Sequence, residues 1–215
     1  MINELPEQAI EEVVSWCDNG EKRFVNFRVD GEIVWQRQWA ESGQLIFERG
    51  VEGDFAHGPQ RSWHDNGQLA DETFFIHGKE HGLAHQYDYE GNLIGTYTMD
   101  HGTGLDQWYQ SAGVLSEERQ YQEGYLHGFE RWYSSDGTIY LEGHFKQGEK
   151  HGIFREWNNK GGLSRGFPQY FVNGARVAKR RYLTACKRDN FLPPYRIVDN
   201  DFHRQPLASP FTGLG

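Results

Sequence analysis

Hydrophobic and polar positions repeat along this 215-residue chain with a period of about 24 residues. Each copy centres on a glycine that an aromatic residue precedes by four positions. In all but the first copy a branched aliphatic residue follows the glycine by two. The glycines are Gly20, Gly43, Gly67, Gly91, Gly113, Gly137 and Gly161, at steps of 23, 24, 24, 22, 24 and 24. Alternating patterns between glycine turns are typical of β-hairpins, so the chain is predicted to be an all-β array of seven tandem hairpins.

A second glycine turn closes most copies about eleven residues later. It lies at Gly31, Gly53, Gly78, Gly102, Gly124 and Gly148. A His-Gly pair follows three or four residues on, beginning at His57, His81, His127 and His151, and Thr103-Gly104 takes its place in the fourth copy. Each unit therefore consists of a strand, a glycine turn, a second strand and a glycine-rich turn. Since each hairpin would contact mainly its neighbours, the array should form an elongated sheet.

The first turn of each unit is predicted to be a three-residue loop. Residues as different as Asn66, Glu90 and Lys160 precede the glycine. A loop of two right-handed residues followed by a left-handed glycine tolerates all of them, whereas a two-residue type I′ loop does not. This loop places the aromatic residue opposite the aliphatic one. The expected cross-strand pairs are Trp63 with Leu69, Tyr133 with Ile139, and Trp157 with Leu163.

Period-two alternation then assigns residues to the two faces of the sheet. One face is expected to carry the aromatic residues, the aliphatic residues and the distal Phe75, Met99, Tyr121 and Phe145. The opposite face is expected to carry Glu48, Glu72, Glu118 and Glu142. One polar position interrupts the apolar face, at Arg61, His85, Gln107, Arg131 and Arg155. These side chains either cover neighbouring rings with their apolar stems or form a ladder of donors in a binding groove.

The second interpretation yields candidate partner-binding residues on the aromatic face. They are Trp63, Tyr87, Tyr109, Tyr133, Trp157, Arg61, Arg131 and Arg155.

The units resemble MORN repeats in their bacterial variant form, which has a G-x-x-HG step. The residues that carry the resemblance are GYLHGFERWYSSDGTIYLEGHFKQGEKHG (124–152) and GKEHGLAHQYDYEGNL (78–93), and the likeness spans roughly residues 16–174. The resemblance implies an elongated, twisted antiparallel sheet. Bacterial proteins built this way are often labelled antitoxins of the YwqK type, which are thought to neutralise a toxin by binding it. The first unit, without His-Gly after Gly31, and the fourth depart from the pattern.

The two ends of the chain break the period. Residues 1–15 are expected to cap the array, with Pro6 opening one helical turn before a strand enters at 13–16. The array itself is assigned to residues 16–174. A helix is expected from Ala175 to about Lys187, within a cap at 175–192 that either covers the last hairpin or binds a partner. Residues 193–215 are expected to be extended or mobile.

Composition and charge narrow the class of partner. The net charge is −9, but residues 175–215 carry eight basic against three acidic residues, which leaves −14 for the rest. An acidic body repels phosphate backbones, so nucleic acid is not expected, whereas a basic protein would be attracted. The absence of a long apolar run argues against a membrane span. The N-terminus lacks the features of a signal peptide, and the two cysteines form no framework, so a cytoplasmic protein is expected.

Catalytic, metal and cofactor sites are not expected. Consecutive His-Gly pairs would lie ~10 Å apart along the sheet, too far for one metal ion. His77 and His85 lie near His81 in the sequence, but no carboxylate or cysteine is evidently fixed beside them. No nucleophile elbow, phosphate loop or H-E-x-x-H motif occurs.

Three functions remain open from the sequence. The favoured one is a non-catalytic protein-binding module, most concretely an antitoxin or immunity-type protein that binds a basic partner. The second is a structural scaffold or membrane-peripheral protein whose basic segment 176–188 contacts anionic lipid. The third is an unrecognised hydrolase. The sequence predicts neither the partner's identity nor the oligomeric state.

Overall fold

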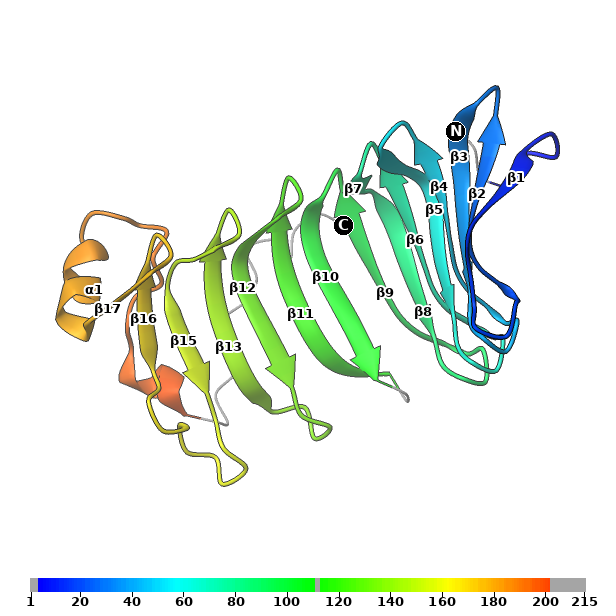
Figure 1. Cartoon of the computed structure of the whole chain (residues 1–215). Helices are drawn as coiled ribbons and strands as arrows, with labels where there is room; N and C mark the ends of the chain where they lie inside the picture. Colours follow the sequence, from blue (N-terminus) through cyan, green and yellow to red (C-terminus); the bar gives the residue numbers. More distant parts are fainter. Residues whose placement is uncertain (1–3, 111–112, 202–215) are drawn as a thin grey trace. The chain divides into compact units, whose positions relative to one another are not determined.

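The computed structural model describes residues 4–110 and 113–201 and shows antiparallel β-structure with one short α-helix (Figure 1). The prediction of an all-β fold built from tandem hairpins is confirmed. The chain divides into two units, Met1–Gly102 and Thr103–Gly215. No helix in the described ranges is both long and apolar enough to cross a membrane.

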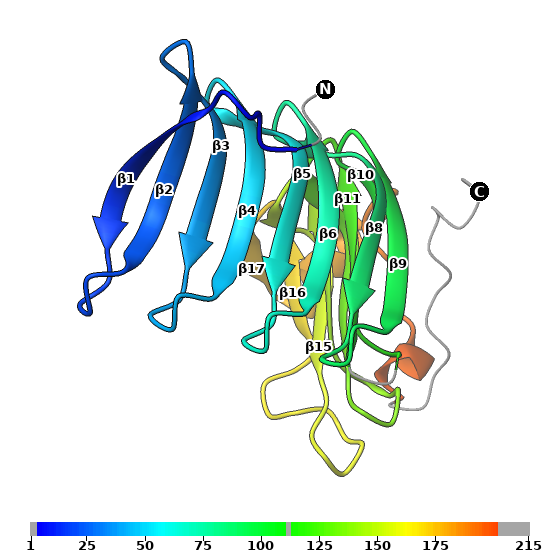
Figure 2. The same ribbon diagram turned by 90° about the vertical axis from the view of Figure 1, so that its right-hand side faces the viewer.

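In unit 1 the strands β1 to β6 pair with their neighbours in chain order and lie side by side in Figure 2, and β6 then pairs with both β7 and β8. The strands are β1 (Ile10–Trp16), β2 (Lys22–Val29), β3 (Glu32–Trp39), β4 (Leu45–Glu52), β5 (Phe55–Trp63), β6 (Leu69–Ile76), β7 (Lys79–Glu80), β8 (Gly82–Tyr87) and β9 (Leu93–Asp100). One of its buried clusters is Val25, Phe27 and Trp35, against which Leu5, Ala9 and Val13 pack.

Unit 2 continues the hairpin pattern and ends in helical segments. Its elements are β10 (Thr103–Gln110), β11 (Val114–Gln122), β12 (Tyr125–Tyr133), β13 (Ile139–Lys146), β14 (Glu149–Lys150), β15 (Ile153–Glu156), β16 (Gln169–Val172), β17 (Ala175–Val177), α1 (Lys179–Ala185) and the 3₁₀ helix η1 (Ile197–Asn200). Figure 1 shows α1 beside β16 and β17 at the end of the strands. Tyr182 of α1 is fully buried against Ile153, Tyr170 and Leu192.

The first turns are the three-residue loops that the sequence predicts. In β5–β6, the Gly67 N–H donates to the His64 carbonyl and the His64 N–H donates to the Gln68 carbonyl, and Gly67 has a φ of +87°. A positive φ of this size is strained for any residue with a Cβ, which explains the recurring glycine. The expected cross-strand pairs are confirmed: Trp63 with Leu69, Tyr133 with Ile139, and Trp157 with Leu163.

A β-bulge of one residue directly follows the first two of these pairs. Because of it, the assignment of residues to the two faces differs from the prediction. Trp63 pairs with Leu69 but Ser62 pairs with Asp71, so Ala70 has no partner in the register. An extra residue in one strand reverses the parity of everything beyond it. Two expectations are therefore wrong. The glutamates lie on the aromatic face, where each is the cross-strand partner of one of its polar positions. The distal residues lie on the other face. The affected sets are Glu48, Glu72, Glu118 and Glu142, and Phe75, Met99, Tyr121 and Phe145.

The ends of the array differ in detail from the prediction. β1 begins at Ile10, earlier than the predicted strand at 13–16, and a single turn closed by the Ala9 N–H on the Pro6 carbonyl precedes it. The helix covers Lys179–Ala185 only, because residues 175–177 pair with β16 as a strand. Residues 193–201 include the helix η1, and the rest of the predicted tail lies outside the described residues.

Candidate functional site

A line of alternating charges crosses the strands of unit 1 on the aromatic face. Arg37 Nε lies 2.9 Å from Glu48 Oε2, and Arg61 Nη1 lies 3.1 Å from Glu48 Oε1. Arg61 also reaches the next strand, where Nη2 lies 2.8 Å from Glu72 Oε1. Glu48 lies between two guanidinium groups because the bulge places arginine and glutamate directly opposite each other, whereas Glu72 has Arg61 on one side and His85 on the other. We call Arg37, Glu48, Arg61 and Glu72 the unit 1 ladder.

The same line recurs in unit 2 but is buried. Arg131 Nη1 lies 2.7 Å from Glu118 Oε1, and its Nε lies 2.9 Å from Glu142 Oε2. Arg155 Nη1 is 3.1 Å from Glu142 Oε1. The Tyr133 hydroxyl donates to Glu118 over 2.8 Å, and burial raises the pKa of that tyrosine. We call Glu118, Arg131, Glu142 and Arg155 the unit 2 ladder.

The C-terminal segment covers the end of the unit 2 ladder. Arg155 Nε donates to Asn200 Oδ1 over 3.1 Å, and the Trp157 indole N–H donates to the Asn200 carbonyl over 2.9 Å. Asp199, itself buried, lies 3.9 Å from the Arg155 guanidinium. In the described part of unit 1, the ion-pair partners of Arg61 and Glu72 come from the ladder itself. The unit 1 ladder is therefore the more accessible of the two.

The eight predicted partner-binding residues divide accordingly. Arg131 and Arg155 are 1% and 3% exposed, and Tyr133 and Trp157 are also buried, so these four offer no surface to a partner in this structure. The remaining four are half-buried: Arg61, Trp63, Tyr87 and Tyr109. Partner binding by these residues stays a prediction. In unit 1 the candidate residues are Arg61, Trp63 and Tyr87.

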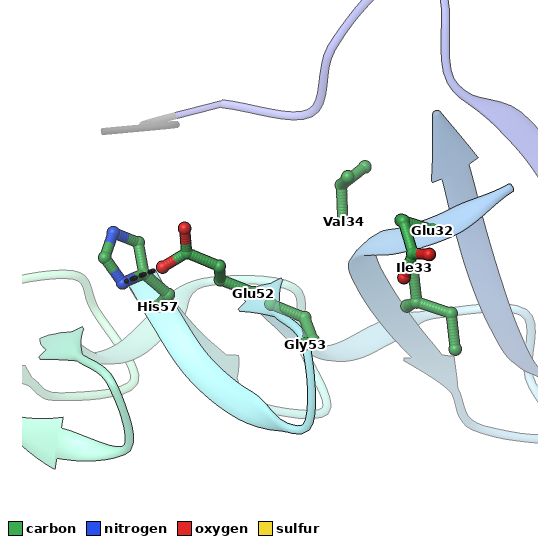
Figure 3. Close-up of a pocket in the computed structure, with 7 residues that line it drawn as sticks. Glu32, Ile33, Val34, Glu52, Gly53 and His57 are labelled. Carbon is green, nitrogen blue, oxygen red and sulfur yellow. Dashed lines mark ion pairs between the residues drawn. The ribbon is translucent and has the colours of Figure 1, made fainter. Parts of the chain in front are cut away.

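Unit 1 also has a groove at the second turns of its first hairpins, with a volume of about 430 Å³ (Figure 3). Aliphatic side chains line it: Ile33, Val34 and Val51. Its polar groups are the carboxylates of Glu32 and Glu52 and the ring of His57, whose Nδ1 lies 3.0 Å from Glu52 Oε2. An apolar channel with two acidic groups matches a long aliphatic side chain that ends in a cation. Sequence reasoning missed this groove.

The His-Gly histidines hold consecutive second turns together. Nδ1 of His127 accepts the backbone N–H of Gln147 over 3.4 Å, and the equivalent bonds join His57 to His77, His81 to His101, and His151 to Asn173. Thr103 Oγ1 accepts the Glu123 N–H in the fourth copy. Each acceptor serves a residue with positive φ at the start of the next second turn. The histidines are thus turn residues, and their rings join one second turn to the next by accepting a backbone N–H.

Among the residues that the structure describes, two groups of side chains could hold a metal ion. They are Glu52 with His57 and His77, and Asp100 with His81 and His101. The sequence analysis considered His77 only as a neighbour of His81 in the sequence, and it did not consider His101. A histidine 20 residues after a His-Gly histidine, with a carboxylate beside either turn, was the signal that could have found both groups.

Comparison with known proteins supports the repeat assignment in one hairpin. Residues 56–77, which contain β5 and β6 almost entirely, match the MORN repeat variant. No curated protein matches the chain. MORN repeats are generally modules for interaction with proteins or membranes.

Proposed function

We propose that this chain is a non-catalytic protein-binding module whose partner is a basic protein. In its most specific form it is an antitoxin or immunity-type protein that neutralises the partner by binding it. The groove of unit 1 carries the proposal, because its aliphatic walls and two carboxylates suit a lysine or arginine side chain. The resemblance of the repeats to those of YwqK-type antitoxins supports the specific form.

The charge distribution supports the same class of partner. Residues 1–102 contain seven lysines and arginines against nineteen aspartates and glutamates, a net charge of −12. A field of this sign accelerates association with a basic protein and excludes an acidic one. The half-buried Arg61, Trp63 and Tyr87 add aromatic and hydrogen-bonding area in the same unit.

The test is site-specific crosslinking in the native host. A photoreactive residue in place of Val34, which lines the groove, should capture one basic protein that mass spectrometry identifies. The purified pair should then bind in solution, with affinity that falls as salt rises. If that partner inhibits growth when expressed alone, co-expression of this chain should restore growth.

Matched charge variants decide whether the groove is the contact. Glu32→Gln should weaken the purified complex about two- to fivefold, as expected for one exposed charge pair. Glu41→Gln removes the same charge from the first turn, at the opposite end of the β3–β4 hairpin, and it should leave the affinity unchanged. Equal effects of the two variants would reject the groove, and capture of an acidic partner would reject the proposed partner class.

A further inference from the structure

Two equivalent clusters in unit 1 bring two imidazoles and a carboxylate together. In the first, Nδ1 of His57 and Nδ1 of His77 lie 3.0 and 3.2 Å from the same Glu52 oxygen. In the second, Nδ1 of His81 and of His101 lie 3.3 and 2.7 Å from one Asp100 oxygen. In each cluster, one ligand atom from every member lies within 4.8 Å of the others.

The backbone builds these clusters without help from a ligand. The His-Gly histidine is fixed by accepting the N–H of the residue at the start of the next second turn. Where that residue is itself histidine, its ring is brought against the first, with ring centroids 4.9 Å apart for His57 and His77 and 4.3 Å for His81 and His101. The pairing therefore follows from the repeat, and residue identity alone decides whether a second imidazole is present.

The convergence of lone pairs requires a positive charge among them. A neutral imidazole nitrogen that accepts an N–H presents its lone pair, and a carboxylate oxygen presents another. Such atoms repel at 3 Å unless a proton or a cation lies between them. A tetrahedral metal ion with bonds of about 2.0–2.1 Å would hold its ligand atoms roughly 3.3 Å apart, close to the spacing observed.

The ligand set selects a class of ion. Two imidazoles with one carboxylate suit zinc and its neighbours in the first transition row, whereas Mg²⁺ and Ca²⁺ prefer oxygen ligands. Three protein ligands leave a fourth position for water. Most of the ligating side chains are at least half exposed, and that of His77 is 66% exposed, so an ion can enter directly from solvent.

We propose that each cluster binds one divalent transition-metal ion of the Zn²⁺ class, which gives two ions per chain. In these two copies the bound ion joins adjacent second turns through their side chains. In the other copies a hydrogen bond from the backbone to the His-Gly ring makes this connection. Binding replaces the backbone N–H at Nδ1 of His57 and His81 with the metal.

Unit 2 provides a natural control for this proposal. Gln147 occupies the position of the second histidine after His127, and Asn173 occupies it after His151. A groove of about 260 Å³ lies here, lined by Lys146, Gln147, Glu149, His151 and Asn173. Both the Lys146 ammonium and the His151 ring pair with Asp189, at 3.5 and 3.1 Å. An ammonium group beside the imidazole repels a metal cation, so these positions should remain metal-free.

The test is a titration of the full chain with Zn²⁺ at pH 7.5, in competition with a chromophoric chelator. We expect two ions per wild-type chain, one for His77→Gln, one for His101→Gln and none for the double variant. His127→Gln is the matched control in unit 2 and should retain two. Co²⁺ in place of Zn²⁺ should give visible absorption bands that are lost in the same variants, while far-UV circular dichroism verifies that each variant folds.

Two results would overturn the proposal. One is a wild-type chain that takes up no Zn²⁺ even at large molar excess. The other is a double variant that still binds two ions, because the binding would then belong to other groups. Glu52 and His57 belong to both the groove and the first cluster, but the titration uses the chain without a partner, so neither result depends on the partner-binding function. Glu32, which tests the groove, belongs to neither cluster.

Discussion

The two units carry the same ladder of arginine and glutamate but use it differently. In unit 1 the ladder is partly open, with the Arg61 side chain 26% exposed. In unit 2 the ladder is sealed, because the hydrophobic cluster of Tyr133, Ile139 and Trp157 adjoins it and Asn200 bonds its last arginine. The repeat thus specifies where the charges lie, and the surrounding non-repeating residues decide whether they stabilise the fold or face a partner.

The two units also differ in net charge. Residues 103–215 contain fifteen lysines and arginines against twelve aspartates and glutamates, a net charge of +3, compared with −12 in unit 1. An array of similar hairpins therefore has one strongly acidic unit that is suited to recognition. The other unit, with its own covering segment, is suited to stability.

The largest expected effect comes from removing one arginine from each ladder. Arg131→Ala should lower the free energy of unfolding of unit 2 by about 3–5 kcal/mol, because it leaves the buried carboxylates of Glu118 and Glu142 without their shared cation. Arg61→Ala, its counterpart in unit 1, should cost about 1 kcal/mol or less, since the Arg61 side chain is 26% exposed and the buried Glu48 keeps its ion pair with Arg37. Urea unfolding of the full-length variants, followed by circular dichroism, measures both. Equal losses would contradict the distinction between a sealed and an open ladder.

A pH effect of intermediate size should be confined to unit 2. His144 is buried and its Nδ1–H donates to the His151 carbonyl over 2.7 Å. Burial lowers the pKa of His144 to about 4, against 6.5 for an unperturbed histidine. Between these pH values His144 is protonated in the unfolded chain but not in the folded chain. The free energy of unfolding therefore falls as the pH is lowered from 6.5 to 4. The loss attributable to this one group is about 3 kcal/mol.

His144→Gln provides the measurement. The free energy of unfolding, recorded from pH 7.5 to pH 4 in urea, should fall less steeply for this variant than for the wild type. A His144→Gln slope identical to that of the wild type would show that the burial of this ring does not control the acid sensitivity of unit 2.

The hairpins and their turns could be predicted from the sequence because their constraints are local. Gly67 must adopt a positive φ, and the loop length then fixes Trp63 opposite Leu69. The bulge at Ala70 could not be predicted, since the equivalent residue in another copy is Tyr140 and no side chain is required there. That one extra residue moves the glutamates onto the aromatic face, so the ladders could not be predicted from regular alternation.

The candidate site was less predictable because it depends on contacts outside the period. Asn200 bonds Arg155 from 45 positions away through a segment that has no counterpart in the repeats. The groove in unit 1 combines side chains from three strands and a turn, and only their registered assembly creates a cavity. The periodic pattern identified Arg61, Arg131 and Arg155 as equivalent, but it contains no information on which of them are covered.

The smallest effect tests the covering segment through a single hydrogen bond. Trp157→Phe removes the indole N–H that donates to the Asn200 carbonyl, and it should destabilise unit 2 by about 0.5–1.5 kcal/mol beyond the loss of ring area. Trp63→Phe makes the same change at the equivalent position of unit 1, where the ring is half-buried, and it should show only the loss of area. Hydrogen exchange should localise the first effect to residues 195–200. Unchanged exchange there would mean that the indole bond does not hold the segment, and that the packing of Tyr182 and Leu192 and the Arg155 bond to Asn200 suffice.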